Sequence, residues 1–477
     1  MLNCQLNGKE VTGKIMVKAE TRFESPHKTT FWIVITILIA LLGLGIFGAG
    51  GQVGIKIDPL KPAIGKRTPV KIELSEPRRG LVSVKVELIQ DRNSVVLEEK
   101  TYKPSSQFLF WRAKTVRDAF EVEAGSTAMP SLTSGFASLR VTAARAKTWI
   151  RRPEPNIVEI KLPVRLAPPS LQITSSQTYV AQGGCEAVTY RVGETAVRDG
   201  VQAGNWWFPG YPMPWGGRQD RFAIFAVPYD MAQPRVRLIA EDEIGNQAEI
   251  SFIDKLFPRT FKSDSIEVTE SFMRKVVPEI MSQAPHIKDR GNLLDNYLAI
   301  NRELRAENDQ TLKQLASSSK PQFLWSRPFL RLPNAKVMAA FADHRTYMYQ
   351  GRIIDHQYHL GYDLAVTRQY PVPAANDGIV VYARYFGIYG NTVIIDHGCG
   401  LQTIYGHLSS IAVKEGEEIK RGQILGKTGE TGLAGGDHLH FCTLLQGLAV
   451  NPIEWWDGHW IKDRIAKKLG AAWPFAE

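Results

Sequence analysis

Cysteine is scarce in this sequence of 477 residues, which contains only four, at positions 4, 185, 399 and 442. No CxxC pair occurs, so the pattern argues against a scaffold built on disulfides. A single bridge between Cys399 and Cys442 remains an open alternative. With 44% hydrophobic and 22% charged residues, the composition is that of a globular protein. The length predicts about three domains.

Charge is absent between Lys28 and Lys56, and residues 31–49 form an apolar run of 19 residues. That length predicts one transmembrane helix at 31–50, although a cleaved signal peptide is an alternative. Residues 1–30 carry five Lys and Arg against three Glu, and the positive-inside rule then predicts a cytoplasmic tail. The remaining chain is expected on the outer side of the cytoplasmic membrane, periplasmic or extracellular.

Positive charge is concentrated in residues 51–165, which hold 21 Lys and Arg against 12 Asp and Glu in a chain of net charge +10. Beside a membrane, such a surface would attract anionic lipid or an anionic wall polymer. A solvated surface without a specific partner is the alternative. Nucleic acid is not an expected partner, because the segment is predicted to lie outside the cytoplasm and carries no recognisable binding motif.

Alternating apolar and polar residues predict two β modules after the membrane segment. At 66–100 the alternation is typical of antiparallel strands with one buried face, which indicates a β-sandwich-like module at 51–166. A second set of strands ends in a hairpin around Gly245 and indicates an Ig-like module at 167–258. Neither module shows the spacing of a metal site or a nucleophile.

Residues 259–320 change character and predict a helical arm. Leucines recur at helical spacing over 293–315, without Gly or Pro, so an apolar stripe must be buried somewhere. One hypothesis is that the arm packs across a groove of the domain that follows it and restrains the activity of that domain. A strand-rich domain at 321–460 and a C-terminal tail at 461–477 follow. The predicted fold is therefore mainly β, with a membrane helix, two β modules, a helical arm and a C-terminal antiparallel β domain.

The segment "GGDHLHF" (435–441) places two histidines on one surface. In a β-strand, residues two apart project from the same face, so His438 and His440 would point one way and Leu439 and Phe441 the other. Alone, this pair is weak evidence for a site, since two histidines on a strand are also found on ordinary surfaces.

Two further motifs supply partners for this pair. "HLGYD" contributes His359 and Asp363 on either side of Gly361, a residue that permits an unusual backbone turn. With His440 they would offer zinc two nitrogens and one oxygen, leaving the fourth tetrahedral position for water. "YGHL" adds His407.

Six segments occur in a characteristic order: HLGYDLA, GNTVIIDHG, YGHLS, GQILGKTGETG, GDHLHF and NPIEWW. This ordered set resembles the lysostaphin/LytM-like zinc endopeptidases, which cut peptide cross-links in bacterial cell wall and have the duplicated hybrid motif fold. The resemblance covers roughly 322–456. It implies a small, mostly antiparallel β domain with a groove over the metal.

The resemblance also implies a role for each site residue. His359, Asp363 and His440 correspond to the ligands of one zinc ion per chain. His407 and His438 correspond to the pair that contacts the activated water and the polarised carbonyl. Which of these two is the general base stays open. His356 is a rival ligand through "HQYH", whereas His397 is expected to be structural.

The resulting prediction is a membrane-anchored zinc metalloendopeptidase that hydrolyses peptide cross-links of peptidoglycan. A non-catalytic LytM-like regulator of another wall hydrolase is the first alternative; it would be favoured by the loss of a ligand or catalytic histidine, and all five residues are present. A structural or export-associated wall-binding protein is the second.

Overall fold

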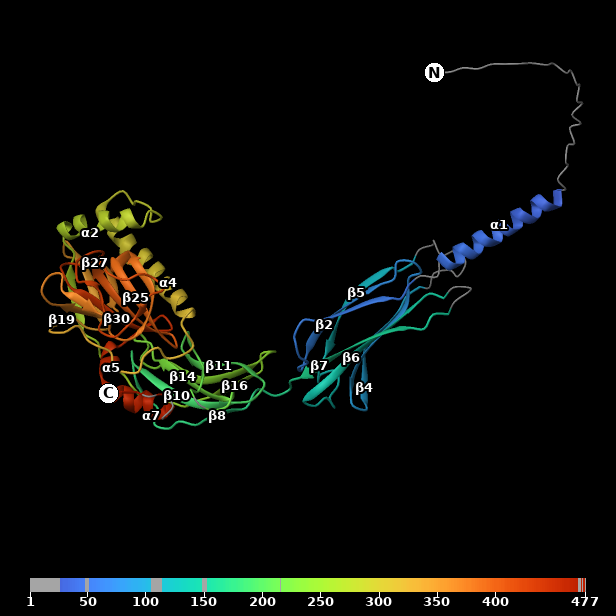
Figure 1. The fold of residues 1–477 in the computed structure, drawn as a ribbon, viewed down its shortest axis with the longest axis horizontal. Helices are drawn as coiled ribbons and strands as arrows, with labels where there is room; N and C mark the ends of the chain where they lie inside the picture. Colours follow the sequence, from blue (N-terminus) through green and yellow to red (C-terminus); the bar gives the residue numbers. More distant parts are fainter. Residues whose placement is uncertain are drawn as a thin grey trace, which may run out of the picture. The chain divides into compact units, whose positions relative to one another are not determined.

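The computed structural model describes residues 26–47, 51–103, 114–147, 152–214, 216–470, 473, 475 and 476. Cys4 and most of the predicted cytoplasmic tail lie outside these residues. The chain divides into two compact units, Met1–Val164 and Arg165–Glu477, and each is described by itself (Figure 1).

Helix α1 (Pro26–Phe47) covers most of the predicted membrane segment. Its described side chains are largely exposed, with Trp32 at 65% and Ile39 at 63%. Among the helices of the described residues, none has both the length and the apolar character needed to cross a bilayer. The anchor at 31–50 remains a prediction from the sequence.

The first unit contains two antiparallel sheets. One has the order β1-β2-β5 and the other β4-β3-β6-β7. Alternate residues of β2, namely Val70, Ile72 and Leu74, are almost fully buried, as expected for strands with one face in a core. The strands are β1 (Gly54–Pro59), β2 (Thr68–Ser75), β3 (Leu81–Gln90), β4 (Asn93–Thr101), β5 (Arg117–Ala124), β6 (Gly135–Arg145) and β7 (Asn156–Val164).

The second unit begins with two four-stranded sheets, in the orders β13-β14-β10-β8 and β12-β11-β15-β16. The hairpin predicted around Gly245 is confirmed, because β15 pairs with β16 and Gly245 has a φ of +93°. The strands are β8 (Leu171–Ile173), β10 (Cys185–Val192), β11 (Ala196–Ala203), β12 (Trp206–Pro209), β13 (Tyr211–Pro212), β14 (Asp220–Ala226), β15 (Val236–Asp242) and β16 (Gln247–Ile250). A short parallel pair joins β9 (Tyr179–Ala181) to β17 (Lys255–Phe257).

The helical arm (259–320) starts with a strand that the sequence analysis did not predict. Strand β18 (Ser263–Glu267) pairs in parallel with β20 (Asp343–Tyr349) and so joins the arm to the C-terminal domain. The helix predicted at 293–315 is present, interrupted by one π-helical turn. The arm's helices are α2 (Glu270–Gln283), α3 (Leu293–Ala299), the π turn η1 (Ile300–Leu304) and α4 (Arg305–Ser317).

An eight-stranded sheet forms the centre of the C-terminal domain, in the order β19-β22-β30-β26-β25-β24-β28 with β31 beside β30 (Figure 1). Strand β21 pairs with β20, and β23, β29 and β27 form a small third sheet. The strands are β19 (Lys336–Ala339), β21 (Arg352–His359), β22 (Tyr362–Ala365), β23 (Pro371–Pro373), β24 (Gly378–Tyr385), β25 (Asn391–Gly398), β26 (Leu401–Leu408), β27 (Ser410–Ile411), β28 (Glu418–Ile419), β29 (Ile424–Lys427), β30 (Leu439–Leu445) and β31 (Leu448–Val450).

The segment predicted as a C-terminal tail packs into the second unit. Ile461, Ile465 and Leu469 are fully buried, and Lys468 forms an ion pair of 3.0 Å with the buried Glu186 of β10. One hydrophobic cluster runs through the Ig-like strands, the arm and the C-terminal domain. The last helical segments are α5 (Pro452–Trp456), α6 (Gly458–Ile461), the π turn η3 (Lys462–Ala466) and α7 (Lys467–Leu469).

Candidate active site

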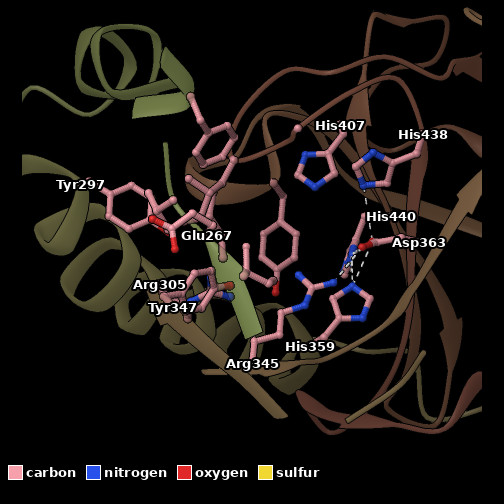
Figure 2. A pocket seen from close by; sticks show the side chains of 17 residues that line it. Glu267, Tyr297, Arg305, Arg345, Tyr347, His359, Asp363, His407, His438 and His440 are labelled. Atoms are coloured by element: carbon pink, nitrogen blue, oxygen red, sulfur yellow. Dashed lines mark hydrogen bonds and ion pairs between the residues drawn. The ribbon is translucent and has the colours of Figure 1, made fainter. Parts of the chain in front are cut away.

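The three predicted zinc ligands converge beside the central sheet. His359 ends β21, and Asp363 in β22 lies directly opposite His440 in β30. The Nε2 atom of His359 and the Nδ1 atom of His440 each lie 2.9 Å from Oδ1 of Asp363, and 3.2 Å from one another. Figure 2 shows these side chains meeting at one point. Strand pairing thus brings together residues that are about 80 positions apart.

The hydrogen bonds at this point leave lone pairs facing each other. The Nδ1–H group of His359 donates to the carbonyl oxygen of Ala340 at 2.9 Å, so Nε2 is an acceptor when the ring is neutral. This nitrogen faces the acceptor Oδ1 of Asp363, and a cation between them would remove the repulsion. Two imidazole nitrogens and a carboxylate oxygen match a catalytic zinc donor set, and the bond to Ala340 orients the ring as in known zinc sites. The residues therefore fit a zinc ion.

His407 and His438 lie next to this cluster. His407 is near the end of β26, whose Gly406 is the Cα partner of His440. The Nε2 atom of His438 lies 3.4 Å from Oδ1 of Asp363, and the rings of His407 and His438 have their centroids 4.9 Å apart. All five residues predicted for the site are therefore brought together (Figure 2).

Backbone carbonyl groups set the tautomers of this histidine pair. The Nδ1–H group of His407 donates to the oxygen of Thr431 at 2.8 Å, and that of His438 donates to the oxygen of Gly436 at 2.7 Å. Each neutral ring therefore keeps its Nε2 as an acceptor, and both rings line the pocket. His407 also has a φ of +61°, an unusual left-handed conformation of the kind found at functional sites.

Burial and mutual contacts shift the charges of the cluster. Burial alone would raise the pKa of Asp363, but attraction to His359, and the hydrogen bonds that His359, His438 and His440 can donate when protonated, hold it well below its usual value. Burial lowers the pKa of His440 to about 4. Burial, together with His438 and His440, also lowers the pKa of His407. In His438 the effect of burial is outweighed by the hydrogen bond and attraction to Asp363, and its pKa is raised.

Gly361 allows close packing rather than the unusual turn predicted for it. It is not among the glycines with positive φ in the described residues. A Cβ atom at this position would lie 2.7 Å from Nε2 of His440 and 2.7 Å from the carbonyl oxygen of Phe441. Only a glycine therefore lets the His359–Asp363 turn approach the ring of His440 so closely.

A pocket of about 330 Å³ opens over the cluster, and the helical arm forms part of its wall. The arm contributes six lining residues: Ile266, Glu267, Val268, Phe272, Tyr297 and Arg305. Strand β20 contributes Arg345 and Tyr347. The Nη2 group of Arg345 donates to Oδ2 of Asp363 at 3.0 Å, on the side of the carboxylate away from the cluster.

The arm also holds the loop that orients His407. The Oε1 atom of Glu279 in α2 accepts hydrogen bonds from the backbone N–H of Gly432 at 2.9 Å and from the hydroxyl of Tyr385 at 3.2 Å. Gly432 directly follows Thr431, whose carbonyl oxygen binds His407. The arm is thus linked to a proposed catalytic side chain through two consecutive backbone groups.

The sequence analysis missed the pocket residues Arg345, Tyr347 and Arg305. Strand periodicity could have placed Arg345 and Tyr347 on one face, because they are two residues apart. It could not have shown that this face borders the site, since that depends on the pairing of β20 with both β18 and β21. Arg305 had no distinguishing local signal.

Two other histidines lie outside the cluster. His356, the rival ligand, stacks on His344 with a centroid distance of 5.5 Å and is not part of the three-residue group. Both nitrogens of the buried His397 have partners, the oxygen of Asp377 at 2.6 Å and the hydroxyl of Thr403 at 2.8 Å, which is a structural arrangement. Cys399 and Cys442 are free and buried, so they form no bridge in this structure.

Comparison with known proteins identifies the domain that carries this site. Residues 357–452 match the family model described as Peptidase family M23. The Peptidoglycan DD-endopeptidase ShyA of Vibrio cholerae is 30% identical over 198 residues, which cover 40% of this chain and 43% of that protein. DD-carboxypeptidase/endopeptidase Mpg of Neisseria meningitidis serogroup B is 39% identical over 95 residues, covering 20% of this chain and 22% of that protein. The matches thus span less than half of these relatives.

Among solved structures, the catalytic domain of lysostaphin from Staphylococcus simulans is similar. It is 29% identical with a TM-score of 0.23, covering 26% of this chain and 92% of that domain. The match of residues 357–452 to the family model of peptidase family M23 confirms the resemblance inferred from the motifs.

Proposed function

We propose that the protein is a zinc metalloendopeptidase that hydrolyses peptide cross-links of bacterial peptidoglycan. The observation that carries the proposal is the convergence of His359 Nε2, Asp363 Oδ1 and His440 Nδ1, with His407 and His438 beside them. Relatives named as peptidoglycan endopeptidases support the substrate. The complete set of five residues favours an enzyme over a non-catalytic regulator.

The side chains have separable roles in the proposed hydrolysis. His359, Asp363 and His440 would hold one zinc ion, which when bound polarises a carbonyl group and lowers the pKa of a bound water. The Nε2 atoms of His407 and His438 are acceptors in the pocket, so one can take the proton of the attacking water. The protonated ring can then return that proton to the leaving amine, and the other ring can stabilise the developing oxyanion.

Digestion of purified peptidoglycan tests the proposal. Zinc-loaded full chain is expected to release peptide fragments, whose masses identify the bond that is cut, while the His440→Ala chain releases none. Zinc-loaded wild type that releases no fragment from walls of any cross-link chemistry would favour the regulatory alternative. A chain that neither takes up zinc nor releases fragments would point to a structural wall-binding role.

We also propose that residues 31–50 anchor the protein in the cytoplasmic membrane, with the chain after residue 50 on the outer side. The support is the uncharged run of 19 apolar residues and its basic flank. The excess of Lys and Arg at 51–165 would add attraction to anionic lipid or wall polymer. Mass spectrometry of the mature protein tests this: the first 30 residues should be retained, and an N-terminus near residue 50 would indicate a cleaved signal instead.

A further inference from the structure

Two guanidinium groups line the pocket beside the metal-binding cluster, and neither belongs to the group of three predicted ligands. Arg345 comes from β20 and Arg305 from the start of α4. Figure 2 shows Arg345 extending toward His359 and Asp363, with Arg305 on the side of the pocket formed by the arm. The pocket also holds the carboxylates of Glu267 and Asp363, but guanidinium groups pair well with carboxylates and phosphates, so the two arginines suit an anionic group of a ligand.

Arg345 lies within reach of the reacting groups. Its Nη2 group contacts Oδ2 of Asp363 at 3.0 Å, while Oδ1 of the same carboxylate faces the two ligand histidines. A guanidinium carries five N–H donors, so the contact with Asp363 leaves others for a ligand. A guanidinium is not deprotonated in proteins, so the group is a fixed cation.

Arg305 is held in place by its own helix. Its Nε group donates to the carbonyl oxygen of Asn301 at 3.1 Å and its Nη2 group to Oδ1 of the same residue at 2.7 Å. Asn301 is fully buried and donates in turn to Oδ2 of Asp355 at 2.7 Å. The π turn η1 immediately precedes Arg305, and such turns are frequent at functional sites. The second guanidinium is thus positioned rather than free to swing.

The rest of the pocket suits a small aliphatic group of the ligand, next to its anionic group. Tyr297, Phe272 and Leu433 supply apolar surface. Glu267 also lines the pocket, but its side chain is exposed, so water and salt weaken its repulsion of an anion. Arg345, in contrast, is only 20% exposed and acts where screening is weak.

We propose that Arg345 and Arg305 form a subsite for the free α-carboxylate of the residue whose amine leaves during hydrolysis. The proposal rests on the peptidase function proposed above. In that reaction the water oxygen adds to the acyl carbon, the C–N bond breaks and the amine nitrogen takes up a proton. The carboxylate is attached to the carbon next to this nitrogen, which places it a few bonds from the metal-binding cluster, where Arg345 lies.

This subsite selects one class of substrate. A D-alanyl bond to a residue with a free α-carboxylate fits it, whether that residue is a diamino acid in a cross-link or the terminal residue of a stem peptide. An amide bond within a glycine bridge does not fit, because the corresponding carbonyl is itself amidated and carries no charge. Bidentate pairing of guanidinium with carboxylate supplies the discrimination.

Two peptides that differ only at this group test the proposal. Both contain the D-alanyl bond; one has the free α-carboxylate on the leaving residue and the other has a carboxamide. Zinc-loaded wild type should show a kcat/KM that is roughly 10- to 100-fold higher for the carboxylate peptide. Arg345→Gln and Arg305→Gln should each reduce this ratio toward one. Arg290→Gln is the matched control, because Arg290 lies on the same arm but pairs with Glu303 at 2.7 Å and does not line the pocket.

Binding measured without turnover gives a second readout. In calorimetric titrations of the zinc-loaded His407→Ala chain, the carboxylate peptide should bind more tightly than the carboxamide peptide, and adding Arg345→Gln should remove the difference. Equal cleavage of both peptides by wild type would overturn the subsite while leaving the peptidase function intact. An Arg345→Gln chain that loses zinc and both activities in equal proportion would assign Arg345 to the positioning of Asp363 and overturn its role in the subsite. Cleavage of neither peptide nor purified wall by the zinc-loaded wild type would reject the proposed function and the subsite together.

Discussion

The Nδ1–H group of His407 donates to the carbonyl oxygen of Thr431 at 2.8 Å, and the next backbone N–H, that of Gly432, donates to Glu279 of the helical arm. The arm therefore supports the loop that fixes the tautomer of His407. This contact, with the ion pair of Lys275 and Glu430 at 2.7 Å, favours an arm that completes the active site. It argues against the hypothesis that the arm restrains activity.

We expect Glu279→Ala to lower turnover on cross-linked peptide by about 10-fold or more, because misplacement of a catalytic group by a fraction of an ångström is costly. Zinc content should change little, because Glu279 bonds to Gly432 and Tyr385 and is not one of the three predicted ligands. The thermal unfolding midpoint should also change little, because the side chain of Glu279 is partly exposed. Glu279→Gln is the matched control: its amide oxygen can still accept from Gly432, so most activity should remain. Increased turnover in Glu279→Ala would instead support restraint by the arm.

The metal-binding assignment predicts the effect of removing single ligands. His359→Ala, Asp363→Ala and His440→Ala should each bind zinc at least about 100-fold more weakly than wild type, because even partners of ligands change affinity by 10- to 100-fold. Competition with a chromophoric chelator measures this affinity. His356→Ala is the control and should bind zinc like wild type. Full zinc affinity in the His359→Ala or Asp363→Ala chain would show that the assignment is wrong.

His407→Ala and His438→Ala should behave differently from the ligand variants. Both are expected to keep stoichiometric zinc and a normal fold but to lose at least about 100-fold in turnover, which is the usual size of a general acid–base or oxyanion contribution. Zinc content and turnover are measured on the same preparation. If either variant retained wild-type turnover with bound zinc, that histidine would have no part in the chemistry.

Glu454 predicts a pH dependence of stability away from the active site. Its Oε2 atom accepts from the backbone N–H of Cys185 at 2.7 Å, and burial raises its pKa to about 7 from 4.5. The folded state thus holds the proton more tightly than the unfolded state. The free energy of unfolding should fall as pH rises from about 4.5 to about 7, by about 3 kcal/mol in total.

Glu454→Gln isolates this effect, because the amide keeps an acceptor for Cys185 but does not ionise. Thermal unfolding midpoints measured between pH 4.5 and 8 should fall less in the variant than in wild type. The variant should be the more stable chain at pH 8. Parallel profiles for the two chains would mean that the buried carboxyl group is not the cause.

The cluster of site residues was predictable, whereas the pocket around it was not. His438 and His440 share a face because strand geometry requires it, and ordered motifs supplied His359, Asp363 and His407. The local signal for Arg305 was absent: it is one polar residue of an amphipathic helix, and its place at the pocket depends on the pairing of β18 with β20. Long-range strand pairings of this kind cannot be recognised from the residues next to Arg305 in the sequence.

The role expected of Gly361 shows a second limit. A glycine between two ligands suggested a special backbone angle, but the structure requires it for the close approach of His440 from β30. The local sequence shows that a glycine allows both an unusual backbone angle and a close approach of other atoms. Only the folded structure shows that the close approach is the property used here. The same holds for 461–477, where buried side chains such as Ile465 belong to a packed helical segment.

The most direct measurement of the central claim incubates a purified, cross-linked peptide dimer with the chain loaded with one equivalent of zinc. Mass spectrometry monitors the conversion of the dimer to monomers. The wild type is expected to produce monomers with the mass of one added water per cleaved bond. His407→Ala, with the same zinc content, should produce them at least about 100-fold more slowly. Dimer that stays intact with the zinc-loaded wild type, or equal rates for the two chains, would contradict the account.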